Sequence, residues 1–182
     1  MIAEPSLLPP PGYYQVAYES CPPLIRGCNQ RLLQAEEVTE TCELLLATAL
    51  RYACPYWLLD GRSHQQEQPQ ALHNWMREEY FPRVAAQLER PVCIAFLVPG
   101  AVWAGLQAKG YDEPLDWHSP VARLGWFTEE SPALAWLAQR RNQPGSYPAA
   151  GRAATPLVGS PPLGKAYPFA VWNRLVNPDK FD

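Results

Sequence analysis

The chain has 182 residues, of which 47% are hydrophobic and 18% charged, and its formal net charge at pH 7 is −3. This balance is typical of a folded domain with its own core, and the length suits one domain better than two. A slightly acidic chain without a run of Lys or Arg excludes an extended nucleic-acid or anionic-membrane surface, because both depend on clustered positive charge. No apolar segment approaches the roughly 20 residues that a membrane span needs. The start of the chain has no basic and apolar signal-peptide pattern, so we expect a cytoplasmic protein.

Proline divides the chain into three parts. Four of the 21 prolines lie in residues 1–12 and seven in residues 142–182. Because proline lacks an N–H and fixes φ, we expect a proline-rich arm over 1–12, a compact domain over 13–141 and a Pro-, Gly- and Ala-rich tail over 142–182. The tail ends with several aromatic residues, and this apolar surface predicts that it docks on its own domain or on a second copy.

Within residues 13–141 the hydrophobic pattern predicts alternating strands and helices. The expected strands are residues 13–18, 24–28, 56–59, 91–98 and 122–127. The expected helices are residues 35–53, 69–88 with a kink or restart at Pro82, 101–108, and 128 to about 141, with a polar loop over 109–120. Strands 56–59 and 91–98 are apolar without alternation, as in a parallel sheet buried on both faces. We therefore predict an α/β sandwich whose sheet of four to five strands is mostly parallel and opens with an antiparallel hairpin.

This order of elements resembles the STAS-like domain of bacterial anti-sigma-factor antagonists, in the divergent group shared with lipid-carrying CRAL-TRIO domains. The resemblance covers about residues 13–141. It rests on the early hairpin, the helix 35–53 and the strand that ends Leu58-Leu59-Asp60. It also rests on a following helix with Trp75, Glu78, Glu79, Phe81 and Pro82.

In the antagonist family a phosphorylatable serine directly follows an aspartate at the end of this strand. Asp60 matches that aspartate, but Gly61 follows it and the nearest hydroxyl is Ser63. The resemblance therefore implies a regulatory protein–protein contact in bacterial signalling, with Ser63 as the candidate for phosphorylation.

One cluster of chemically different polar residues stands at the end of a predicted strand: Asp60, Arg62, Ser63 and His64. Ligands and partners meet α/β sheets just beyond the carboxyl ends of the strands, so the cluster is a candidate partner or ligand surface. The alternative is structural, with Asp60 accepting turn N–H bonds and pairing with Arg62. A hydrolase triad is a weaker hypothesis, because a triad draws its members from separate elements and no Gly-x-Ser-x-Gly elbow is present.

Aromatic residues gather after the second buried strand, among them Trp103, Tyr111, Trp117 and Trp126. They either pack in the core or form an apolar surface beside the Asp60 turn. The second reading predicts a carrier or sensor of a small apolar, lipid-like ligand, as the CRAL-TRIO resemblance implies.

The cysteines and histidines do not indicate a metal site. The five cysteines contain no Cys-x-x-Cys pair, and the nearest two, Cys21 and Cys28, are separated by six residues. We expect reduced, mostly structural cysteines and no zinc. The three histidines, His64, His73 and His118, lack His-x-x-x-His spacing, and no glycine-rich loop could cradle a phosphate. We therefore expect no cofactor and no enzyme activity, and a protein that acts through contact with a partner or with itself.

Overall fold

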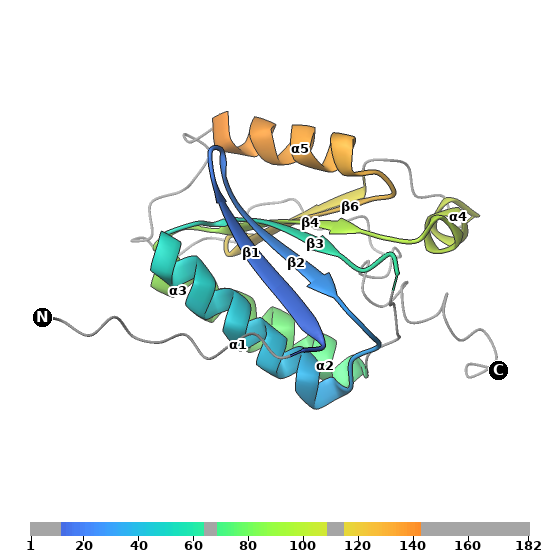
Figure 1. Ribbon diagram of the computed structural model, residues 1–182, viewed down its shortest axis with the longest axis horizontal. Helices are drawn as coiled ribbons and strands as arrows, with labels where there is room; N and C mark the ends of the chain where they lie inside the picture. The colour runs from blue at the N-terminus through green and yellow to red at the C-terminus, as the bar shows by residue number, and fades with distance from the viewer. Residues whose placement is uncertain (1–11, 64–68, 109–114, 143–182) are drawn as a thin grey trace, which may run out of the picture.

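The strands of the domain form one mixed sheet, which the computed structural model describes for residues 12–63, 69–108 and 115–142 (Figure 1). The six strands are β1 (Tyr14–Ser20), β2 (Pro23–Asn29), β3 (Tyr56–Asp60), β4 (Val92–Leu97), β5 (Leu115–His118) and β6 (Ala122–Phe127). They are ordered β1-β2-β3-β4-β6-β5. The pairs β1–β2 and β5–β6 are antiparallel, and the three central pairings are parallel.

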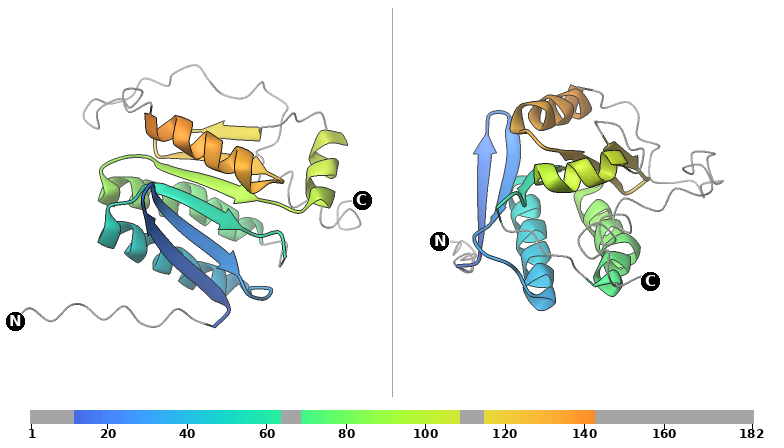
Figure 2. Two further views of the ribbon diagram at one scale, coloured as in Figure 1. Left: turned by 45° about the horizontal axis from the view of Figure 1, so that its top comes forward. Right: turned by 90° about the vertical axis from the view of Figure 1, so that its right-hand side faces the viewer.

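Helices cover both faces of this sheet. They are α1 (Ala35–Tyr52), α2 (Gln70–Trp75), the π-helical turn η1 (Met76–Tyr80), α3 (Phe81–Leu88), α4 (Gly100–Ala108) and α5 (Glu130–Asn142). Helices α1, α2 and α3 lie on one face, α5 lies on the other, and α4 lies beyond the end of β4 (Figure 1, Figure 2). No helix in the described ranges is long and apolar enough to cross a membrane.

The core has two layers because the central strands bury both of their faces. On β3, Trp57 belongs to the layer under α1 and α3, whereas its neighbour Leu58 belongs to the layer under α5. On β4, Ile94 and Ala95 divide in the same way. Successive side chains of a strand point to opposite faces, so a continuous apolar run is what two covered faces require.

The predicted fold class is confirmed at the level of an α/β domain with a mostly parallel sheet opened by an antiparallel hairpin. Five of the strands lie where the sequence predicts them. The sixth, β5, lies in residues 109–120, which were expected to be a loop, and it pairs antiparallel with β6 at the edge of the sheet. It has four residues, too few for alternation to separate a strand from a polar loop.

The helix after Pro69 passes Pro82 without stopping. Pro82 lacks an N–H, and its ring would collide with the carbonyl four residues earlier in a regular α-helix. Here the preceding turn, η1, is π-helical, and the Phe81 N–H donates to the Met76 carbonyl five residues back. The wider turn accommodates the proline, and α3 continues from Phe81.

The proposed arm and tail fall outside the described residues, apart from Gly12 and Asn142 at their inner ends.

Candidate functional site at the end of β3

Asp60 is the last residue of β3 and lies at the edge of the sheet where the parallel strands end. In the sheet it stands between Cys28 of β2 and Leu97 of β4. Leu58 and Leu97 belong to the core layer under α5, so the Asp60 side chain emerges on the α5 side of the sheet. The Gly61 N–H donates to the Leu97 carbonyl at 3.1 Å, which ties the turn after β3 to β4.

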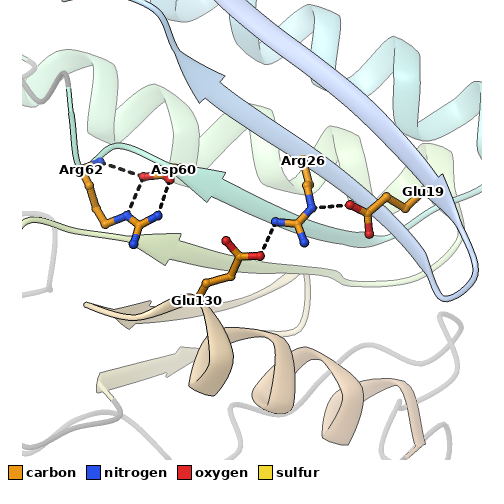
Figure 3. Close-up of polar contacts among 5 residues, drawn as sticks. All are labelled: Glu19, Arg26, Asp60, Arg62 and Glu130. Carbon is orange, nitrogen blue, oxygen red and sulfur yellow. Dashed lines mark hydrogen bonds and ion pairs between the residues drawn. The ribbon is translucent and has the colours of Figure 1, made fainter.

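Arg62 occupies both carboxylate oxygens of Asp60 (Figure 3). Its backbone N–H and its Nε–H donate to Oδ1 at 3.0 and 3.1 Å, and its Nη2–H donates to Oδ2 at 2.7 Å. The backbone bond closes an Asx turn, and the two guanidinium bonds form a bidentate ion pair. These contacts agree with the structural role predicted for Asp60, which accepts the turn N–H and pairs with Arg62. They do not exclude that the pair also binds a partner.

The ion pair sets the charge state of both groups. The Arg62 hydrogen bonds hold the pKa of Asp60 below its usual value, and the Asp60 carboxylate raises the pKa of Arg62. Cys28 lies beside Asp60, and burial followed by the Asp60 charge raises the pKa of its thiol. A protonated thiol is a poor nucleophile, so Cys28 does not provide a reactive group here.

A second charged group, not predicted from the sequence, lies near the Asp60 turn. Arg26 of β2 bonds to Glu19 of β1 and, through Nη1, to an Oε1 of Glu130 at 2.7 Å (Figure 3). Glu130 is the first residue of α5, so this bridge joins the hairpin to the helix across the open face of β2. The hairpin predicted from the sequence would bring Arg26 close to β1. Glu130 lies 104 residues further along the chain, and no sequence pattern near Arg26 predicts that the two residues meet.

We call Asp60, Arg62, Ser63, Arg26 and Glu130 the β3-end surface. Glu130 and its neighbour Glu129 also act on Arg62, because their charges raise its pKa. Carboxylates and arginines thus alternate across this face of the molecule, and Ser63 is exposed at its end.

Trp103, one of the aromatic residues predicted for the same surface, does not lie there. Trp103 of α4 is only 5% exposed and packs in the core layer under α1, on the opposite side of the sheet from the Asp60 side chain. Trp117 is on β5, with its side chain outside the description, and His64 and Tyr111 lie outside the described residues. The arrangement therefore separates Trp103 from Asp60 instead of joining them in one pocket.

The described residues hold no group of three or more His, Cys, Asp or Glu side chains that could bind a metal ion. At the β3-end surface each carboxylate is engaged by an arginine, and the Cys28 thiol is held in its protonated form. Paired charges on an exposed face are suited to binding a partner, whereas acid–base chemistry requires a group that is free to exchange a proton at the reacting atom.

No family model, curated protein or solved structure matches this chain.

The stabilising effect of the Asp60–Arg62 pair is expected to depend on pH. Because the folded-state pKa of Asp60 is lowered, the pair stabilises the fold above the unfolded pKa of about 3.9, and this contribution is lost as pH falls through the folded pKa. Asp60→Asn keeps an acceptor for the turn but removes the charge. We expect it to cost less than about 1 kcal/mol at neutral pH, since solvent screens the half-exposed pair, and less still at pH about 3. Urea unfolding at both pH values measures the difference, and a larger cost in acid would contradict this account.

Proposed function

We propose that this protein is a non-enzymatic cytoplasmic domain of the STAS-like kind that regulates another protein by binding it through the β3-end surface. The observation that carries the proposal is the arrangement of Asp60 and Arg62 at the carboxyl end of a central parallel strand, where α/β sheets meet their ligands. The hairpin followed by parallel strands and intervening helices supports the STAS-like part.

Asp60 prepares Arg62 to bind a partner. It takes the Nε–H and an Nη2–H, and in the described part of the chain Nη1 of Arg62 has no hydrogen-bond partner. The Arg62 side chain is 37% exposed, so Nη1 can reach solvent or a second protein. A guanidinium already held by a carboxylate loses little side-chain entropy when it binds, and arginine is among the residues that contribute most to protein interfaces. We infer that a carbonyl or carboxylate oxygen of the partner accepts from Nη1.

Ser63 provides a means of control at the same surface. It is exposed and directly follows Arg62, and six residues separate it from Gln70, where α2 begins. A phosphate there would have the Arg62 guanidinium beside it and the carboxylates of Asp60, Glu129 and Glu130 on the same face. Its oxygens would compete with Asp60 for Arg62 and so change the group offered to the partner.

The test compares Arg62→Gln with Arg90→Gln, an exposed arginine at the opposite, amino end of β4. Proteins captured from the native lysate by the unchanged chain are identified by mass spectrometry, and the best candidate is purified and titrated calorimetrically. We expect Arg62→Gln to weaken binding by about tenfold or more, as loss of an interface arginine does, and Arg90→Gln to leave it unchanged. Equal affinity of both variants would reject the β3-end surface as the binding site.

One observation favours a second function, a carrier of a small apolar ligand. The indole Nε1–H of Trp103 is buried, and it has no hydrogen-bond partner in the described part of the chain. Buried donors are normally satisfied, so an acceptor on a bound molecule would explain this one. Native mass spectrometry of the protein used in the binding test decides between the two functions: a retained lipid-sized adduct supports the carrier, and its absence supports the interaction domain.

A further inference from the structure

Among the described residues, the strand β1 is an edge of the sheet that pairs only with β2 and lacks the sequence features that usually protect an edge. It ends the strand order, and its register with β2 runs unbroken over all seven residues from Tyr14 to Ser20. Natural edge strands avoid pairing with other chains by being short or by carrying proline, bulges or lysine. β1 contains none of these, and its one charged residue, Glu19, is neutralised by Arg26. The opposite edge, β5, has only four residues.

The alternation of hydrogen-bonded and non-hydrogen-bonded pairs in the hairpin shows which backbone groups of β1 point away from β2. The Gln30 N–H donates to the Tyr13 carbonyl at 2.9 Å, in line with the register of the hairpin. In an antiparallel ladder, bonded and non-bonded pairs alternate. Odd-numbered residues of β1 therefore bond to β2, and the N–H and C=O groups of the even-numbered residues face outward. These are Tyr14, Val16, Tyr18 and Ser20. Pro23 agrees with this phase, because its position opposite Ser20 requires no N–H.

We propose that β1 pairs antiparallel with β1 of a second copy about a two-fold axis at Ala17, which makes one continuous sheet across a homodimer. In this register Tyr14 faces the partner's Ser20, and Val16 faces the partner's Tyr18. Each of the four residues whose backbone N–H and C=O groups point away from β2 is then opposite such a residue in the other copy. A two-fold interface must be self-complementary, and the backbone phase of β1 meets that requirement.

The side chains are also compatible with a second copy. On the α1 side, Val16 would contact the partner's Tyr18, and Tyr18 carries Tyr52 stacked on it with ring centroids 4.0 Å apart. Tyr52 is 40% exposed and is one of few large apolar side chains so exposed in the described ranges. On the other side, Gln15 would face the partner's Glu19, and Ala17 would face the partner's Ala17. No like charges stand opposite each other, and the stacked Tyr18–Tyr52 pair, of which Tyr52 is exposed, lies at the seam.

Engineered disulfides test the register directly. Cys21 is exposed, so Cys21→Ser is introduced first to remove background crosslinking. Ala17→Cys then places two thiols opposite each other at a non-hydrogen-bonded pair, where the Cα atoms lie about 4.5 Å apart and a disulfide fits. Gln15→Cys is the matched control, because residue 15 is equally exposed on the same face but would meet Glu19. Under mild oxidation with oxidised glutathione, we expect at least about tenfold more covalent dimer from Ala17→Cys. Equal crosslinking at both positions would overturn the register.

A second variant tests the strand pairing without cysteine. Val16→Pro removes an outward N–H, which an edge strand tolerates because β2 does not use it. At about 0.1 mM protein, we expect light scattering after size exclusion to show a dimer for the full chain. The variant should be a monomer with an unchanged circular dichroism spectrum. A monomeric parent chain would show that β1 is not the interface. So would a dimer that persists in the Val16→Pro variant while Ala17→Cys gives no crosslinked dimer. Arg62→Gln should leave the dimer intact, so the failure of this inference and the failure of the proposed function can be told apart.

Discussion

Replacing Trp57 by alanine is expected to lower the free energy of unfolding by about 3–5 kcal/mol, the cost typical of removing a large buried aromatic side chain. Trp57 is the second residue of β3 and is 0% exposed, in the core layer under α1. Its indole N–H also donates to the Cys54 carbonyl at 3.0 Å, so the change would leave that buried acceptor unpaired. Urea unfolding followed by circular dichroism measures the loss, which is a large fraction of the about 5–15 kcal/mol that stabilises a typical domain.

Trp57→Phe is the matched control, because it keeps most of the apolar volume and loses the hydrogen bond with a smaller cavity. We expect a cost below that of alanine, by more than about 1 kcal/mol. A loss under about 1 kcal/mol for the alanine variant would contradict the central place of Trp57 in the core.

Gly27→Ala is the second substitution with a large expected effect, and its cause is crowding. A Cβ at Gly27 of β2 would lie 2.0 Å from Tyr14 Oη and 2.8 Å from Leu59 Cδ2, both too close for real contacts. Overpacking of a rigid core costs about 1–3 kcal/mol, and we expect the upper part of that range because two neighbours must move. Thermal unfolding and urea titration both measure the effect.

Removing the nearest colliding atom should restore part of the loss. In Tyr14→Phe the hydroxyl oxygen is gone and the closest remaining ring atom, Cζ, would lie 2.8 Å from the new methyl group. The double variant with Gly27→Ala should therefore be more stable than the sum of the single changes by about 1 kcal/mol. Gly61→Ala is the control for glycine loss alone, since its Cβ would meet only the Leu97 carbonyl oxygen at an ordinary 3.6 Å. Additive behaviour of Tyr14→Phe and Gly27→Ala would show that Tyr14 is not what excludes a side chain at position 27.

The elements with strong local patterns could be predicted well from sequence. The apolar runs 56–59 and 91–98 became β3 and β4, buried on both faces, and the stripe over 35–53 became α1. The predicted helix also included Ala53. In the structure Ala53 is exposed and follows the helix, with a left-handed φ of 48°. A periodic pattern extends as far as its apolar residues do, whereas a helix ends where backbone hydrogen bonding ends. Pro82 predicted a kink or restart of the helix, and the structure has a π-helical turn directly before it, after which α3 begins at Phe81.

In the candidate site, too, the local contacts could be predicted from the sequence and the distant contacts could not. Asp60 at a strand end and Arg62 two residues later are local, because an Asx turn and a bidentate pair need only that spacing, and the sequence alone indicated both. The burial of Trp103 and the bond from Arg26 to Glu130 needed the folded chain. So did the place of β1 at the edge of the described sheet. Burial, ion pairing across 104 residues and strand order depend on which distant segments meet in space, and a pattern read along one chain carries no measure of those distances.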